Sequence, residues 1–141
     1  MEDHKLTEDR VIELLMPYLK SRDWKIESYC LGQKRGIDIV ALKNGKKLVV
    51  ETKGAKANDN SPTKKRKYFD SGQIKDHFGK AIVKSLETKN NFPESVVAIA
   101  QPLDEDIKRA IGGIIPNLND IGIVHFWVKS NGEIIVEGAI E

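Results

Sequence analysis

The chain has 141 residues, 40% of them hydrophobic and 31% charged, which is enough to bury one core without disulfides, so we expect a single domain over residues 1–141. No apolar run approaches the ~20 residues that a membrane helix needs, and the N-terminal segment lacks the apolar stretch of a secretory signal. These features argue against a membrane protein and predict a cytoplasmic location. The net charge of +2 is only mildly basic and does not by itself indicate a nucleic-acid partner.

The first predicted helix covers residues 6–20, where apolar residues recur at helical spacing and Thr7 is a suitable N-cap. Pro17 falls inside this pattern and should kink or end the helix. Residues 24–30 then alternate between apolar and polar types, as in a half-buried strand. Cys30, the single cysteine, has no partner for an internal disulfide, and we expect it to be a buried strand residue.

Two short apolar runs, residues 37–42 and 47–51, predict a β-hairpin. Asn44 and Gly45 lie between them, and both residues tolerate the positive φ that a tight turn requires. Beyond the hairpin, residues 54–69 have the composition of a loop. This loop contains a cationic run of Lys64, Lys65, Arg66 and Lys67.

The second predicted helix covers residues 70–89, with Asp70 or Ser71 as its cap. A β-branched, apolar run at residues 95–100 predicts a strand covered on both faces. The residues expected to share the buried face of the helix are Ile74, Phe78, Ala81, Ile82 and Leu86.

The C-terminal part predicts one more helix and two more strands. The helix covers residues 104–115 and should be closed by Pro116. A strand follows at residues 121–128, and Asn131-Gly132 predicts a last hairpin that ends at Val136. The resulting order, α-β-β-β-α-β-α-β-β, indicates an α/β fold with a mixed sheet flanked by helices.

Candidate catalytic residues surround the first hairpin. Glu51 and Lys53 point to the same side of their strand because side chains alternate, and folding the hairpin returns Asp38 toward both. Two carboxylates suit Mg²⁺, which is often held by one or two carboxylates together with substrate phosphate and waters, and the backbone carbonyl of Thr52 is a further candidate ligand. Lys53 would orient the attacking water or offset charge on the phosphorus.

Gly36-Ile37-Asp38, a twelve-residue gap and Glu51-Thr52-Lys53 together resemble the signature of the PD-(D/E)xK nuclease superfamily. Its members share an α-β-β-β-α-β core, include restriction enzymes and archaeal Holliday-junction resolvases, and cleave phosphodiesters with Mg²⁺. The resemblance covers roughly residues 6–100 and implies a restriction-endonuclease-like fold with Asp38, Glu51 and Lys53 as catalytic residues. The sequence departs from the signature in having Ile37 where the family has proline.

The same resemblance implies two further site residues. Many members add an acid from the first helix to the metal site, and Glu8 is favoured over Glu13 for this role because it shares a helical stripe with the apolar residues. Related nucleases often place a polar residue near the start of the second helix, where Gln73 lies. His77 follows one turn later as a candidate phosphate contact. Helix-dipole stabilisation explains Glu8 about as well, and ordinary surface polarity explains Gln73 and His77.

The sequence therefore predicts a Mg²⁺-dependent endonuclease acting on DNA, with Mn²⁺ as an alternative ion and residues 64–67 contacting phosphate. RNA ranks below DNA because the few aromatic residues do not interleave with the cationic run. Cleavage of both strands by so small a chain would favour a homodimer. Two alternatives are a catalytically idle DNA-binding or assembly module and a subunit that works only within a larger nuclease assembly.

Overall fold

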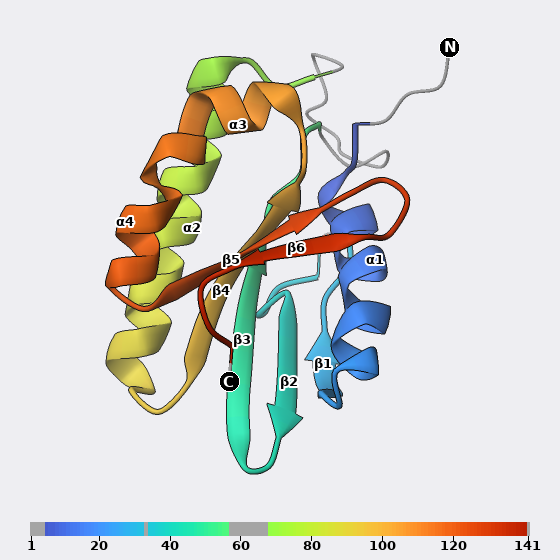
Figure 1. Ribbon diagram of the computed structural model, residues 1–141, viewed down its shortest axis with the longest axis vertical. Helices are drawn as coiled ribbons and strands as arrows, with labels where there is room; N and C mark the ends of the chain where they lie inside the picture. Colours follow the sequence, from blue (N-terminus) through green and yellow to red (C-terminus); the bar gives the residue numbers. More distant parts are fainter. Residues whose placement is uncertain (1–4, 33, 57–67, 141) are drawn as a thin grey trace.

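The computed structural model describes residues 5–32, 34–56 and 68–140, and its centre is a six-stranded mixed sheet (Figure 1). The strands are β1 (Lys25–Tyr29), β2 (Ile39–Lys43), β3 (Lys46–Thr52), β4 (Val96–Pro102), β5 (Ile123–Val128) and β6 (Ile134–Glu137). They lie side by side in chain order; β3, β4 and β5 are parallel, and the other neighbouring pairs are antiparallel.

Helices cover both faces of this sheet, which confirms the predicted mixed sheet flanked by helices. They are α1 (Glu8–Ser21), α2 (Ser71–Asn91), α3 (Glu105–Ile111) and α4 (Ile115–Asp120). α1 packs on one face, and α2, α3 and α4 pack on the other, so that two apolar clusters sandwich the sheet (Figure 1). None of the helices in the described ranges is long and apolar enough to cross a bilayer.

α1 begins where the sequence predicts, because the Thr7 hydroxyl accepts a hydrogen bond from the Arg10 N–H at 3.1 Å. Of the two outcomes expected at Pro17, a kink or an end, the helix does not end there, and α1 continues to Ser21. Pro17 and Glu13, whose carbonyl loses its N–H partner at the proline, are both exposed, so water can solvate that carbonyl. The buried side chains that hold the helix on both sides of the proline are Val11, Ile12, Leu15 and Leu19.

β1 departs from simple alternation because it contains a β-bulge. Ile26 pairs with Ala41, but Ser28 pairs with Val40, so Glu27 is the additional residue. After the bulge, each side chain points to the face opposite to the one that regular alternation predicts, so the prediction of regular alternation is wrong. Cys30 is also not a buried strand residue: it lies just after β1, is half-buried, and donates its N–H to the Asp38 carbonyl at 3.0 Å.

The predicted hairpin is confirmed between β2 and β3. Asn44 and Gly45 form its two-residue turn with φ angles of 51° and 78°, and Lys43 pairs with Lys46 across it. Asp38 lies directly before β2 rather than within the strand. The register that the turn sets pairs Ile39 with Val50, which determines what Asp38 faces.

α2 begins with the capping box of Asp70 and Gln73, so Asp70 rather than Ser71 is the cap. Its buried face differs at one position from the expectation. Leu86 is 40% exposed, whereas Ser85 is buried. Ile74, Phe78 and Ala81 are buried as predicted, and Ile82 is half-buried.

The predicted helix over residues 104–115 is not continuous. α3 ends at Ile111, a short 3-10 turn covers Gly112–Ile114, and α4 begins at Ile115. Pro116 therefore starts a helix instead of closing one, which its fixed φ and missing N–H allow in a first turn. The last hairpin is confirmed, with β6 antiparallel to β5 and ending at Glu137.

Candidate functional site

The N-terminal segment docks on the end of β3 and brings Glu8 to the sheet. The Ala55 N–H donates to the Leu6 carbonyl at 2.7 Å, and Thr7 forms a parallel bridge with Lys56. Gly54 permits this approach, because a Cβ there would lie 2.5 Å from the Glu8 nitrogen and 2.8 Å from the Thr7 carbonyl carbon. No other residue fits between these two segments without displacing one of them.

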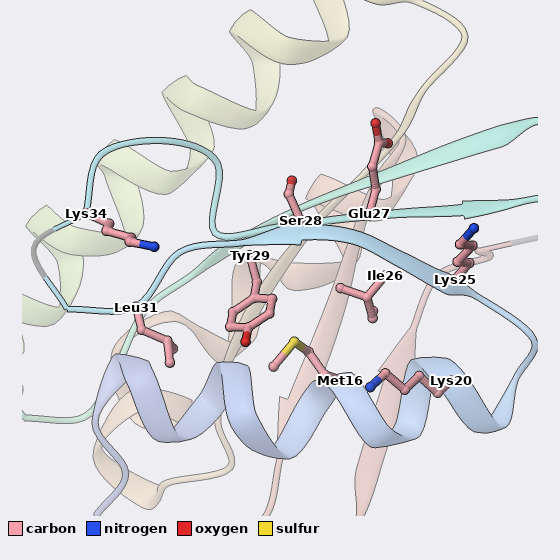
Figure 2. A pocket seen from close by; sticks show the side chains of 9 residues that line it. All are labelled: Met16, Lys20, Lys25, Ile26, Glu27, Ser28, Tyr29, Leu31 and Lys34. Carbon is pink, nitrogen blue, oxygen red and sulfur yellow. The ribbon is translucent and has the colours of Figure 1, made fainter.

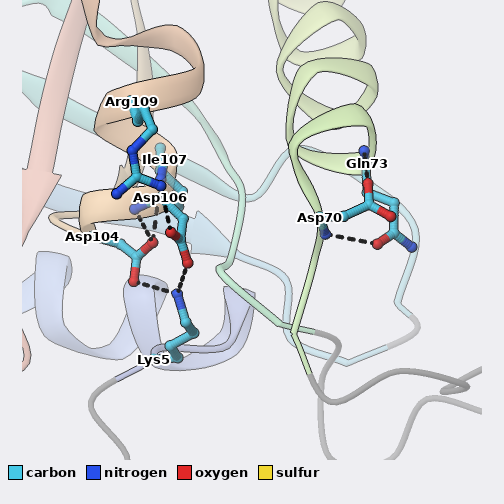
Figure 3. A network of polar contacts seen from close by, with 7 residues as sticks. All are labelled: Lys5, Asp70, Gln73, Asp104, Asp106, Ile107 and Arg109. Atoms are coloured by element: carbon cyan, nitrogen blue, oxygen red, sulfur yellow. Dashed lines mark hydrogen bonds and ion pairs between the residues drawn. The ribbon is translucent and has the colours of Figure 1, made fainter.

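An ion-pair network anchors the residue that precedes this segment (Figure 3). The Lys5 ammonium lies 2.8 Å from a carboxylate oxygen of Asp104 and 2.8 Å from one of Asp106. Asp104 also caps α3 by accepting the backbone N–H groups of Asp106 and Ile107. Residues 5–7 are thereby tied to α3 on one side and to the end of β3 on the other.

Asp38 and Glu51 face each other at the open end of the hairpin. The pairing of Ile39 with Val50 places Asp38 opposite Glu51, and a hydrogen bond joins their carboxyl groups. Asp38 is only 8% exposed, and its carboxylate accepts the Thr52 N–H at 2.9 Å. Because the N–H and C=O of one residue point to the same side of a strand, the Thr52 carbonyl also points to the side of β2.

The protonation of two acids in this site is perturbed. Burial, the hydrogen bond that protonated Glu51 donates to Asp38, and the charge of Asp38 raise the pKa of Glu51 to about 8, against the opposing charges of Lys84 and Lys53. Burial and the charge of Asp38 raise the pKa of Glu8 to about 7. Asp38 thus lies close enough to repel both Glu8 and Glu51, which are themselves partly removed from water.

Two lysines face these acids. Lys53 follows β3 directly, and its N–H donates to the Ala100 carbonyl at 3.0 Å, which fixes its backbone beside β4. Lys84, from α2, has its ammonium 3.8 Å from a carboxylate oxygen of Glu51, although its side chain is 60% exposed. Both cations lower the pKa values of Glu8 and Glu51 without cancelling the effect of burial.

The sequence-based prediction missed Lys84, although a signal for it exists. On a helix, residues separated by seven positions lie nearly above one another, so Lys84 shares the face of α2 that His77 occupies. The charge of Lys53 is one cause of the lowered pKa of His77, after burial, which places His77 beside the same site. The imidazole also stacks edge-to-face on Phe69, with ring centroids 4.4 Å apart.

The remaining predicted residues fall into three groups. Glu13 is exposed and lies 3.8 Å from Arg10, so Glu8 is the helix acid that reaches the site. Gln73 uses its side-chain oxygen to accept the Asp70 N–H, in the capping box (Figure 3). The cationic run of residues 64–67 lies outside the described residues, and its contact with phosphate stays a prediction.

The acids of the site fit a two-carboxylate metal centre better than a three-ligand one. Among residues 5–32, 34–56 and 68–140, no three or more His, Cys, Asp or Glu side chains are grouped to hold a metal ion. Asp38 and Glu51 nevertheless form a hydrogen-bonded carboxyl pair, and Mg²⁺ is often bound by such a pair with waters and substrate phosphate completing its shell. Glu8 adds negative charge beside this pair.

Two solved structures are similar to this chain in fold. An XisH family protein from Nostoc punctiforme PCC 73102 matches with a TM-score of 0.53 and 16% identity, over 90% of this chain and 97% of that one. An fdxN element excision controlling factor protein from Anabaena variabilis matches with a TM-score of 0.56 and 19% identity, over 94% and 99%. No protein-family model matches the sequence, and no curated protein gives a significant match. At these identities the likeness establishes the fold alone.

Proposed function

We propose that this chain is a metal-dependent endonuclease that hydrolyses phosphodiester bonds in DNA. The observation that carries the proposal is the meeting of Glu8, Asp38 and Glu51 with Lys53, from three segments of the chain, at one end of a buried hairpin. Buried acids kept close together against their mutual repulsion are typical of sites that bind a cation. The proposed fold class is restriction-endonuclease-like, and the proposed ion is Mg²⁺.

Each residue has a separate proposed role. Asp38 and Glu51 would hold the ion, which when bound polarises a phosphoryl oxygen and acidifies a water. Lys53 would place its ammonium beside the attacked phosphorus and stabilise the negative charge that develops there. The Thr52 N–H fixes the orientation of the Asp38 carboxylate, so that one oxygen remains directed toward Glu51. Glu8 is proposed to increase the attraction of the site for cations.

The comparisons support DNA as the class of substrate. One neighbour is named for the control of excision of the fdxN element, and excision is a DNA transaction. No residue of this chain is assigned a function from that neighbour, because the sequence identity is only 19%. It favours DNA over RNA for the first experiments.

Cleavage by the purified chain tests this proposal. Supercoiled, linear and branched DNA are incubated with the wild type, Lys53→Ala and Lys46→Ala, each with Mg²⁺, Mn²⁺ or EDTA. Lys46 is the matched control, because it lies exposed at the opposite end of the same strand. We expect cleavage by the wild type and Lys46→Ala with either ion, a loss of at least about 10²-fold in Lys53→Ala, and no cleavage in EDTA.

Two results would contradict the proposal. Equal cleavage by wild type and Lys53→Ala would indicate a contaminating nuclease or a different site. DNA binding without cleavage under every condition would favour the catalytically idle DNA-binding or assembly module instead.

A further inference from the structure

A groove of about 870 Å³ lies between α1 and the strand β1. Figure 2 shows Met16 of α1, Ile26 and Tyr29 of β1, and Leu31 just after β1 gathered between the helix and the strand. Tyr29 is 49% exposed, and the other three side chains are half-buried. The floor of the groove is therefore apolar and open to solvent.

The bulge in β1 creates this floor. Regular alternation would direct Ile26 and Tyr29 to opposite faces of the sheet. Because Glu27 is additional, Ile26 pairs with Ala41 and Tyr29 with Ile39, and both of these partners belong to the core under α1. Both side chains consequently point into the groove, while Glu27 and Ser28 point away from α1 (Figure 2).

β1 is also the terminal strand of the sheet, and among the described strands it pairs with β2 alone. An extended peptide can add to such an edge by backbone hydrogen bonds and place every second side chain in an adjacent pocket. Here the adjacent pocket is the apolar floor beneath β1. The groove volume lies within the range of about 300–1,000 Å³ that is typical of ligand sites.

The positive charges around the groove favour an acidic ligand. Lys20 and Lys25 lie at one end of it and Lys34 lies toward the other, whereas Glu27, the single acid of the lining, points away from α1 (Figure 2). Two copies of this surface would bring like charges together, which disfavours a second copy of this chain as the occupant. DNA would engage the lysines but leave the apolar floor unused. An acidic peptide with apolar side chains satisfies both features.

We propose that this groove binds an extended, acidic segment of another protein by adding it to the edge of β1. Apolar side chains of that segment would cover Tyr29 and Met16, and its carboxylates would pair with the three lysines. The proposal is independent of nuclease activity, since the groove lies on the α1 face of the sheet and the Glu51–Lys84 contact lies on the α2 face.

Peptide selection tests the proposal even though the partner is unidentified. A phage library of random peptides of about ten residues is selected against the full chain, and enriched peptides are synthesised and titrated by fluorescence anisotropy. The titrations use wild type, a groove triple variant (Lys20→Glu, Lys25→Glu, Lys34→Glu) and a control triple variant (Lys46→Glu, Lys47→Glu, Lys108→Glu). Circular dichroism shows that each variant is folded, and Tyr29→Ala tests the apolar floor separately.

We expect the enriched peptides to alternate acidic and apolar residues. Their affinity should fall at least about tenfold in the groove variant and in Tyr29→Ala, but not in the control variant. A central proline in the peptide should also abolish binding, because it removes a strand hydrogen bond. Four results would overturn the proposal: selection of basic or uncharged peptides or of none, equal binding by the groove variant, dimerisation through β1, or duplex DNA as the ligand of these lysines.

Discussion

Two clusters of charged residues lie beside the segment of residues 5–8, and they differ in how well their charges are paired. In the Lys5–Asp104–Asp106 network, one ammonium contacts two carboxylates at 2.8 Å each. Burial lowers the pKa of Lys5, but the hydrogen bonds to both aspartates outweigh it and raise that pKa, while Lys5 lowers the pKa of Asp106. Lys5 and Asp106 are thereby held in their charged forms.

The cluster around Asp38 shows the reverse. The Lys84 ammonium lies 3.8 Å from a carboxylate oxygen of Glu51. The pKa values of Glu8 and Glu51 are raised, which favours the neutral form of both side chains. Buried charge alone therefore does not indicate a site. Buried acids that the protein's own cations neutralise poorly do indicate a site, because a bound cation would supply the missing positive charge.

The largest expected effect is on DNA cleavage, which should depend on the cluster around Asp38 but not on the Lys5–Asp104–Asp106 network. Glu51→Gln should lower DNA cleavage by at least about 10²-fold, whereas Asp104→Asn should leave cleavage within a few-fold of wild type. In contrast, Asp104→Asn should lower the free energy of unfolding by about 1–3 kcal/mol, because it leaves Lys5 with a weaker partner. Cleavage rates and urea denaturation measure the two quantities. An Asp104→Asn variant that is stable but inactive would remove the distinction.

The next effect concerns how Glu8 reaches the site. Gly54→Ala should destabilise the protein by about 1–3 kcal/mol or more and lower cleavage, because the new Cβ would lie 2.5 Å from the Glu8 nitrogen. Gly113→Ala is the matched control, since nothing lies within 4 Å of a Cβ there. Thermal unfolding of both variants measures the difference. Equal melting temperatures would show that α1 can move without cost.

The pH dependence of stability gives a smaller effect with a defined sign. Unfolded Glu51 releases its proton near pH 4.5, but the folded chain retains it up to about pH 8. Between these values the folded state binds more protons, so this residue makes the free energy of unfolding fall as pH rises. Glu51→Gln should therefore stabilise the protein by about 1–3 kcal/mol at pH 8 and by much less at pH 5. Urea denaturation at both pH values measures this, and a gain that is equal at both would contradict it.

The smallest expected effect belongs to Lys84. Its ion pair is exposed, so Lys84→Met should change stability by less than about 1 kcal/mol. Removing a cation that faces Glu51 should lower the Mg²⁺ concentration needed for half-maximal cleavage about two- to fivefold. Lys75→Met, another exposed lysine of α2, should leave that concentration unchanged. A higher Mg²⁺ requirement in Lys84→Met would show that Lys84 assists the metal instead of opposing it.

Local sequence signals predicted most of the fold. Asn44-Gly45 determined the first hairpin, because few residue pairs allow two successive positive φ angles. Thr7 marked the start of α1 by its side-chain hydrogen bond. The continuous helix predicted over residues 104–115 was wrong, because a short 3-10 turn at Gly112–Ile114 divides it. At Pro17 the helix did not end, because buried residues on both sides of the proline hold α1 in place.

The candidate site was predictable to a similar degree. Alternation and the hairpin register were sufficient to bring Asp38, Glu51 and Lys53 together, and the structure places them so. Their catalytic and metal-binding roles stay predictions. Lys84 was missed because its shared helix face with His77 indicates the site only when it is known which part of α2 lies over which strand end, and that depends on how α2 packs on β3 and β4.

The sheet order has a consequence for how the protein reaches its final state. Every strand lies beside its neighbour in the chain, so the sheet can grow by successive additions with modest loop-closure cost. The contact of Glu8 with the end of β3 is different, because it joins segments far apart in the chain and needs that strand end already formed. We therefore expect the acidic cluster to assemble late in folding, which would leave partly folded chains without a complete cation site.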